Sequence, residues 1–407
     1  MVATGDIAKV VGGGTPKTSI TGNFTDSGGH PWVTPADLTG YNDKYISRGR
    51  RNLTDQGLKE SSATYMPAGT VLFSSRAPIG YVAIAANPVT TNQGFRSFVP
   101  SEEVDSEYLY YALKLLRADA EQLASGTTFA EISGTNAKKL RFPLAPKESQ
   151  HQIVNLLDTV SDRRETATNH LYASRQAIEK YRHAVLGAAF REASQACEEE
   201  GSVLDLAQVL REPLKNGYSA RPVTFETQFR VLTLTATTSG LFDGQHFKYT
   251  DEVFPDDSPF WLMPGDVVIQ RGNTAEYVGV PAIYEGGPRE YLYPDLMIRA
   301  RVRDDIDPRY LWYMLLAPQS RKFLRDRATG SAGNMPKINQ KILNVVPIPV
   351  PPIETRKAIV MNLDVRMAVA AATLRRIHEG VGHVDRACQA VARKAFSGSL
   401  TTNPSYR

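Results

Sequence analysis

The sequence predicts an α+β protein in which two similar α+β domains, related by a pseudo-two-fold, are joined by two long helices packed as an antiparallel coiled coil. Two observations lead to this fold class. The chain has 407 residues, too many for one ordinary domain, and it repeats a single plan twice. Each copy ends in a long segment whose apolar residues recur about every 3.5 positions, which is typical of coiled-coil helices.

The repeat is clearest towards the end of each copy. Residues 143–154 recur as residues 349–360 at an offset of 206, and the same offset carries Ala189-Phe190 onto Ala395-Phe396. A constant offset over this distance means that neither copy has gained or lost a residue. Further upstream the offset slips, so the front parts are free to differ while the back parts keep register.

The back parts, residues 148–200 and 353–400, are predicted to be the two long helices. Apolar or small residues follow one another in alternating steps of four and three, interrupted by Arg164 in the first helix and Arg366 in the second. The first helix is net acidic and the second net basic, which favours pairing of the two. An antiparallel pair places one domain at each end. The alternative, two unrelated amphipathic helices docked on their own domains, leaves the shared register unexplained.

The front parts, residues 1–147 and 201–352, are predicted to be α+β domains with long loops. Glycine and proline punctuate short β-rich runs, and each part contains one helix-like stretch, at 107–124 and at 308–327. Residues 401–407 are left as a tail.

Residue types that suit a nucleic-acid groove lie in loops at matching places of the two domains. Arg76 follows a predicted strand of the first domain, and Arg271 follows the matching strand of the second domain. Arginine can donate two hydrogen bonds to a guanine edge, and glutamine or asparagine can do the same for adenine. Hydroxyls and glycine amides can hold phosphates. The structural alternative is turn glycines and solvated arginines. The candidate DNA-binding residues are Lys17, Ser74, Ser75, Arg76, Thr127, Thr128, Tyr218, Gln270, Arg271, Asn273, Ser331, Asn334 and Lys337.

Composition and motif searches predict a chain with no catalytic, cofactor or metal site. Two cysteines cannot form a disulfide framework, and no apolar run is long enough for a membrane span. The N-terminus has no signal-peptide pattern, so a cytoplasmic location is expected. Methyltransferase and phosphate-loop motifs are absent, and the Arg299–Arg301 segment after Asp295 lacks the rest of a nuclease motif. The net charge of +4 is a weak indicator of nucleic-acid binding.

Several motifs resemble those of a known family. They are the Pro-x-x-Pro-x-Glu-(Ser/Thr) motifs at Pro143 and Pro349, the Ile-Val…Leu-Asp segments at Ile153 and Ile359, the helix endings at 188–190 and 394–400, and the openings at 5–8 and 13–16. On these residues the chain resembles the specificity subunits of type I restriction–modification systems over essentially its whole length. It departs from them at the opening of the second half, where Arg211-Glu212-Pro213 replaces the glycine-rich run.

The resemblance implies a division of labour for phage defence. Residues 1–147 and 201–352 would be target recognition domains that each read one half of a bipartite site in double-stranded DNA. The helices would set the spacer and dock two methyltransferase subunits, and restriction subunits through them. S-adenosylmethionine and ATP would be bound by those partners and not by this non-catalytic chain. A close variant is the recognition subunit of a methyltransferase-only or fused enzyme. The alternative from another class is a two-domain protein-binding scaffold with no DNA role.

Overall fold

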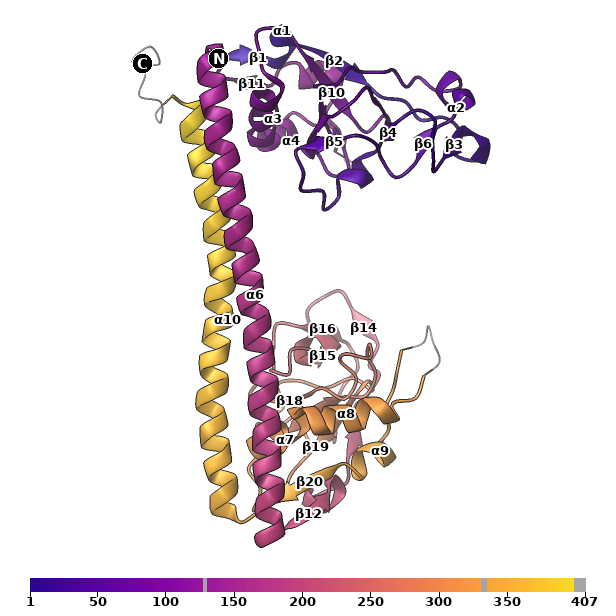
Figure 1. The fold of residues 1–407 in the computed structure, drawn as a ribbon. Coiled ribbons are helices and arrows are strands. Elements are labelled where there is room, and N and C mark those ends of the chain that lie inside the picture. Colours follow the sequence, from indigo (N-terminus) through magenta and orange to yellow (C-terminus); the bar gives the residue numbers. More distant parts are fainter. Residues whose placement is uncertain (127–129, 331–334, 399–407) are drawn as a thin grey trace. The chain divides into compact units, whose positions relative to one another are not determined.

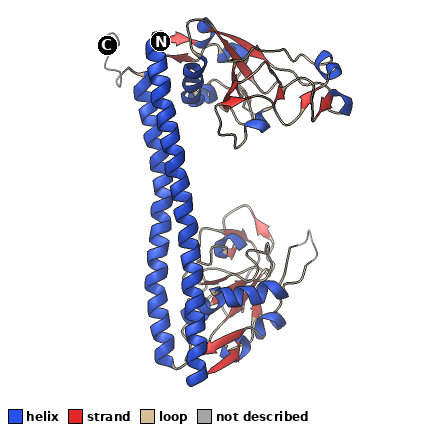
Figure 2. Ribbon diagram, viewed as in Figure 1, coloured by secondary structure: helices blue, strands red, loops and turns tan. Residues whose placement is uncertain are grey.

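The computed structural model describes residues 1–126, 130–330 and 335–398, and these residues form two compact units (Figure 1). Unit 1 consists of Met1–Leu171 together with the segment from Glu379 onward, and unit 2 consists of Tyr172–His378. Each unit therefore contains one α+β domain and one part of each long helix, so the predicted fold class is confirmed (Figure 2). No helix in the described ranges has the length and apolarity needed to cross a membrane.

The two long helices are α6 (Lys147–Glu199) and α10 (Ile353–Phe396). Both begin within a residue of the predicted starts, and α10 ends before the predicted residue 400. The predicted tail, 401–407, lies outside the described residues.

The helices pair antiparallel within each unit. In unit 1, Arg164 near the start of α6 donates to Asp385 near the end of α10, with Nε and Oδ1 2.7 Å apart. In unit 2, the late α6 residue Val185 shares a core with Ile359 at the beginning of α10. Residue numbers thus rise along one helix as they fall along its partner, which confirms the predicted pairing.

The α+β part of unit 1 is built on a five-stranded sheet in the order β2-β10-β7-β8-β5. All its neighbouring strands are antiparallel except β5 and β8. Helix α3 (Ser106–Leu115) is capped by Asp105, whose carboxylate accepts hydrogen bonds from two backbone amides. The apolar face of α3 packs on the sheet. The sheet strands are β2 (Ala8–Gly12), β5 (Tyr45–Ile46), β7 (Val71–Phe73), β8 (Val82–Ala85) and β10 (Arg96–Pro100).

Smaller elements complete unit 1. Strand β1 pairs with β11 at the start of α6, and the segment between β2 and β7 forms a small lobe of short strands and turns. These elements are β1 (Val2–Ala3), α1 (Thr4–Ile7), β3 (Phe24–Thr25), β4 (Trp32–Val33), β6 (Asn52–Leu53), α2 (Asp55–Lys59), β9 (Thr90–Thr91), α4 (Arg117–Gln122), α5 (Gly134–Ala137) and β11 (Arg141–Phe142).

Unit 2 repeats this plan with a four-stranded sheet in the order β13-β19-β17-β18 and a separate three-stranded sheet in the order β14-β16-β15. Strands β12 and β20 pair beside the start of α10, as β1 and β11 do in unit 1. The elements are β12 (Ser202–Asp205), β13 (Lys215–Asn216), β14 (Pro222–Val223), β15 (Phe229–Leu232), β16 (Phe247–Thr250), β17 (Val267–Gln270), β18 (Pro281–Ile283), β19 (Met297–Ala300), α7 (Pro308–Leu316), α8 (Pro318–Arg327), α9 (Gln340–Asn344) and β20 (Pro347–Val350).

A pair of buried tyrosines joins each domain to the chain that leads into its long helix. The hydroxyl of Tyr108 on α3 donates to the carbonyl of Pro143 at 2.7 Å, and that of Tyr310 on α7 donates to Pro349 at 2.8 Å. Both tyrosine side chains are fully buried. The same bond therefore forms in both copies, between positions that match in the sequence repeat.

A second tyrosine, one helical turn further on, bonds to the long helix itself. Tyr111 donates to Oδ1 of Asp158 on α6, and Tyr313 donates to Oδ1 of Asp364 on α10, the latter at 2.7 Å. Burial, together with the adjacent carboxylate, raises the pKa of both tyrosines, so both remain protonated donors at neutral pH.

Each of these two carboxylates also has a cation. Lys44 lies 2.6 Å from Asp158, and Arg309 lies 2.6 Å from Asp364. The lysine lies directly before β5 and the arginine lies on α7, so the two copies supply the same charge from different places in the chain.

We expect Tyr111→Phe and Tyr313→Phe each to lower the free energy of unfolding by about 1.5–3 kcal/mol, because each removes a hydrogen bond to a carboxylate in a partly buried place. Urea denaturation measures the loss. Tyr172→Phe is the control, since Tyr172 is 53% exposed on α6 and its change should cost under about 0.5 kcal/mol. Equal losses for all three variants would contradict the proposed anchoring.

Candidate nucleic-acid interface

In unit 1, four chain segments meet beyond the end of β7. The amide of Ser75 donates to the carbonyl of Gly94 at 2.7 Å, and the Ser75 carbonyl accepts from the amide of Ile132 at 3.0 Å. The amide of Gly14 donates to Thr91 at 2.9 Å. These bonds bring together residues 13–17, 74–76, 91–96 and 131–132, which we call the loop edge of unit 1.

Unit 2 has the same arrangement beyond the end of β17. The amide of Arg271 donates to Leu296 at 2.7 Å, the Arg271 carbonyl accepts from Ile338 at 2.8 Å, and the amide of Tyr218 donates to Tyr293 at 3.0 Å. The loop edge of unit 2 thus consists of residues 217–219, 270–273, 293–296 and 335–338. The sequence had supplied candidates in residues 13–17, 74–76, 217–219, 270–273 and 335–338; the segments 91–96, 131–132 and 293–296 had none.

The shared backbone bonds also fix how the residues of the two loop edges correspond. Strand register places Val71 and Val267 at the same position, because Val71 pairs with Ile84 as Val267 pairs with Ile283. Counting forward, Arg271 corresponds to Ser75, and the residue that corresponds to Arg76 is a glycine, Gly272. Arg76 and Arg271 thus follow equivalent strands but lie one residue apart in the shared register.

The two arginines nevertheless both lie on their loop edges and are partly exposed. One Arg76 nitrogen lies 3.5 Å from a carboxylate oxygen of Glu131. Arg271 donates from Nη1 to the carbonyl of Asp295 at 3.3 Å. Each guanidinium has five N–H donors, so both retain donors for a ligand.

Ser74, Ser75 and Gln270 are fully buried, contrary to the prediction that they contact DNA. The Ser74 hydroxyl donates to Pro78 at 2.7 Å and accepts from the Tyr81 amide at 2.8 Å. These side chains hold their loops in shape and, as placed, cannot reach a ligand at the surface.

The amide of Gln270 is likewise used internally. Its nitrogen donates to the carbonyl of Leu234 at 3.0 Å and to Thr237, and its oxygen accepts from Asn273 at 2.6 Å. Gln270 therefore orients Asn273, which is itself only partly exposed.

The other candidates fall into two groups. Lys17, Tyr218 and Lys337 are exposed on the loop edges, and their contact with DNA stays a prediction. Four candidates lie outside the described residues: Thr127, Thr128, Ser331 and Asn334.

Sequence reasoning missed Arg96 and Glu131 on the loop edge of unit 1. Arg96 donates to Oε1 of Glu131 at 2.9 Å, so this carboxylate lies between Arg96 and Arg76. The DNA-binding candidates from the sequence were cations, hydroxyls and amides, although a carboxylate can also accept a hydrogen bond from a cytosine.

A pocket of about 320 Å³ opens beside the loop edge of unit 2 and includes Tyr218, Thr233, Lys248 and Leu296 in its lining. The ring of Tyr218 packs against Phe254 and Phe260. A hydrogen bond to Glu252 raises the pKa of Tyr218. The backbone amide of Arg221, and after it Tyr218, donate to Glu252 and lower the pKa of that carboxyl.

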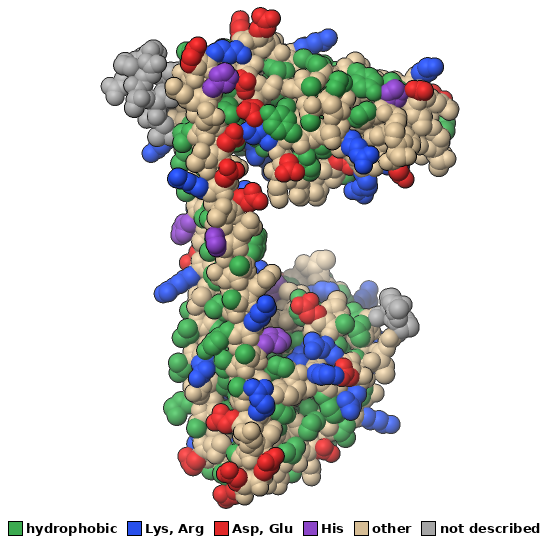
Figure 3. All heavy atoms as spheres, viewed as in Figure 1, with side chains coloured by type: hydrophobic (Ala, Val, Ile, Leu, Met, Phe, Trp, Pro, Cys, Tyr) green, Lys and Arg blue, Asp and Glu red, His purple; other side chains and the backbone are tan. Residues whose placement is uncertain are grey.

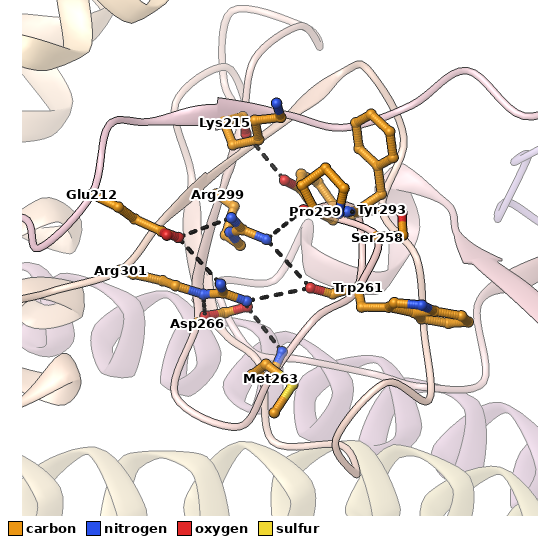
Figure 4. Close-up of polar contacts among 11 residues, drawn as sticks. Glu212, Lys215, Ser258, Pro259, Trp261, Met263, Asp266, Tyr293, Arg299 and Arg301 are labelled. Carbon is orange, nitrogen blue, oxygen red and sulfur yellow. Dashed lines mark hydrogen bonds and ion pairs between the residues drawn. The ribbon is translucent and has the colours of Figure 1, made fainter. Parts of the chain in front are cut away.

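The basic residues behind this edge are structural. Arg299 is 4% exposed; it pairs with Glu212 at 2.9 Å and donates to the carbonyl of Pro259 at 2.6 Å (Figure 4). Arg301 pairs with the buried Asp266 at 2.6 Å. These partners account for both arginines without the faint nuclease motif noted in the sequence.

The surface charge is mixed. In the view of Figure 3, Lys and Arg side chains on both units are interleaved with Asp and Glu, and no block of one charge covers either unit. Across the described part of the chain, no group of three or more His, Cys, Asp or Glu residues is placed to hold a metal ion, and Cys197 and Cys388 are free thiols.

Comparison with known proteins gives a consistent result. Residues 1–174 match the family described as type I restriction modification DNA specificity domain. The MjaIX specificity subunit of Methanocaldococcus jannaschii is 46% identical over 159 residues, which is 39% of this chain and 36% of that subunit. The EcoKI specificity subunit of Escherichia coli K12 is 24% identical over 74% of this chain and 67% of its own. The chain thus aligns with little more than a third of the MjaIX subunit.

Solved structures share the fold. A chain from a structure that addresses complex assembly and conformational transition of a type I R-M system has a TM-score of 0.72 at 19% identity, and the match covers 98% of this chain and 97% of that one. The HsdS subunit of Thermoanaerobacter tengcongensis has a TM-score of 0.52 at 18% identity, covering 98% and 96%.

The loop edges also yield a test of their shared construction. A methyl carbon added to Gly13 would lie 2.1 Å from the carbonyl oxygen of Asn92, and one added to Gly217 would lie 2.2 Å from that of Pro294. We expect Gly13→Ala and Gly217→Ala each to cost about 1–3 kcal/mol of unfolding free energy through overpacking. Gly12→Ala is the matched control, because its methyl carbon meets only Arg96, at 3.8 Å. If denaturation curves show that Gly12→Ala lowers the free energy of unfolding as much as the other two, the two loop edges are not built in the same way.

Proposed function

We propose that this chain is the DNA-reading, non-catalytic subunit of a type I restriction–modification system, since residues 1–174 match the type I restriction modification DNA specificity domain and similar proteins are specificity subunits of such systems. One observation supports this more than any other: a single chain builds the same four-segment loop edge twice. The bonds from Ser75 to Gly94 and Ile132 recur as the bonds from Arg271 to Leu296 and Ile338. A protein with two equivalent reading surfaces suits a target made of two half-sites.

The side chains on the two edges are of the kind that read DNA. Arg76 and Arg271 retain donors that can reach guanine edges, and Lys17 and Lys337 are exposed cations that can contact phosphates. Because the two loop edges share their backbone bonds while the side chains at corresponding positions differ, with Gly272 at the position of Arg76, the two half-sites are expected to have different sequences.

The long helices are proposed to set the spacer between the half-sites and to dock two methyltransferase subunits. Met361, Val365 and Val369 lie at successive i, i+4 positions on α10 and are 61–67% exposed, a solvent-facing apolar row that suits a protein partner. In unit 2, a groove of about 410 Å³ between α6 and α10 is lined largely by small and apolar residues.

The chemistry is proposed to belong to the partners. The methyltransferase subunits would bind S-adenosylmethionine and methylate a flipped adenine, and restriction subunits, docked through them, would use ATP. This chain would then supply recognition alone, in the cytoplasm. Phosphate neutralisation shared with the partners is compatible with a net charge of only +4.

Arg76→Ala and Arg271→Ala should each weaken binding of the assembled complex to its own target by about 1–3 kcal/mol, because each removes guanine contacts in one half-site. Titration of labelled duplexes measures this, and duplexes with one half-site scrambled assign each arginine to its half. Unchanged binding curves for both variants would contradict the assignment of the loop edges.

A second test addresses the spacer. Inserting four residues into α6 and four into α10, at positions 206 residues apart, keeps the repeat in register and lengthens each helix by about 6 Å. The methylated target should then have a different gap between two unaltered half-sites. A change in the half-site letters with the gap unaltered would contradict the proposed role of the helices.

A further inference from the structure

On the loop edge of unit 1, the carboxylate of Glu131 is surrounded by hydrogen-bond donors. Its carboxylate lies between two arginines and beside a serine hydroxyl, and its side chain is 31% exposed. Arg96 comes from β10 and Arg76 from the loop after β7, so two segments of the loop edge meet at one carboxylate.

The two oxygens of Glu131 are used unequally. Oε1 accepts from Arg96 at 2.9 Å and from the Ser75 hydroxyl at 3.4 Å. Oε2 lies 3.5 Å from Arg76, which is longer than the roughly 2.7–2.9 Å of a charge-assisted hydrogen bond. Oε2 therefore retains acceptor capacity, and the Arg76 guanidinium beside it retains donors.

We propose that Arg76 and Glu131 together form a subsite for one G·C base pair in the half-site read by unit 1. In the major groove, guanine offers two acceptors, N7 and O6, and cytosine offers one donor, the N4 amino group. Arg76 donates to the guanine and Oε2 of Glu131 accepts from the cytosine. The inference rests on the proposed function, because it needs the loop edge to face DNA.

Arg96 is a positioning residue in this subsite. It is 20% exposed and donates not only to Glu131 but also to the carbonyl of Phe95 at 2.9 Å. This second bond fixes the guanidinium to the backbone, so Arg96 holds Oε1 and thereby sets where Oε2 points.

Unit 2 does not repeat the subsite. Ser125 and Glu131 in unit 1 are joined by a reciprocal pair of backbone bonds, and Thr329 and Lys337 in unit 2 are joined in the same way. Lys337 thus stands where Glu131 does, and Gly272 where Arg76 does. A donor-only cation cannot accept from cytosine, so the equivalent position of the second half-site is read differently.

The test uses the complete complex of this chain with its methyltransferase partner and a DNA library randomised in both half-sites, with methylated adenines read by sequencing. The wild-type motif is expected to contain an invariant G·C pair in the half-site of unit 1. Glu131→Gln should weaken the preference at that one pair by about 10- to 100-fold, because an amide has a single acceptor oxygen for both Arg96 and cytosine. Arg76→Lys, which keeps the charge but loses the planar fork, should weaken the same pair.

The control is Glu102→Gln, which makes the same charge change at an exposed site of unit 1 and should leave every letter unaltered. The proposal is overturned if Glu131→Gln and Arg76→Lys affect different base pairs. It is also overturned if Glu131→Gln leaves the motif unchanged or slows methylation of all sequences equally. A wild-type complex with no two-part motif would instead overturn the proposed function itself, so the two failures are distinguishable.

Discussion

The hydrogen bonds from Tyr111 to Asp158 and from Tyr313 to Asp364 join each α+β domain to a long helix, beside the apolar cores that the domains share with the helices. Each bond joins a tyrosine hydroxyl, of the partly buried Tyr111 or the buried Tyr313, to a carboxylate that also has a cation. Burial raises the pKa of both tyrosines, which keeps them in the donor form that the carboxylate requires. A reading surface is useful only if its support is rigid, and this contact supplies that support in both copies.

The two domains also share the backbone hydrogen bonds of their loop edges, and they differ in the side chains on those edges. Amide-to-carbonyl bonds at Ser75 and Arg271 assemble both loop edges, and these bonds are indifferent to side-chain identity. Internal bonds of Ser74 and Gln270 then stiffen the loops. Such a construction lets the exposed residues change without loss of the fold. It accounts for two edges of the same shape with different charges, one with an Arg–Glu–Arg group and one with Arg271 and Lys337.

The long helices and the domain plan could be predicted from the sequence because their signals are periodic. A constant offset of 206 and a coiled-coil spacing sustained over both helices leave few alternatives to an antiparallel pair, and the register of Ile153 and Ile359 survives in the structure. The start of α3 was harder to predict, because its signal in the sequence is one capping residue, Asp105, and not a period.

The loop edges were harder, because no period governs them. Register there is set by β-strand pairing: Val71 pairs with Ile84 as Val267 pairs with Ile283, which places Gly272 at the position of Arg76. Polar residues beside a strand end resemble surface ligands in a sequence, yet Ser74 and Gln270 are buried. Glu131 was missed because its partners, Arg76 and Arg96, are distant in sequence and meet it only in the folded unit.

The central claim is that one chain reads two separate half-sites through two equivalent edges. Its most direct test is to express the wild-type chain with its proposed methyltransferase partner in a host without DNA methylation, and to map modified adenines by single-molecule sequencing. The account predicts one motif made of two different half-sites separated by a fixed number of unspecified base pairs. A soluble, copurifying complex that methylates a continuous motif, or no motif, would contradict it.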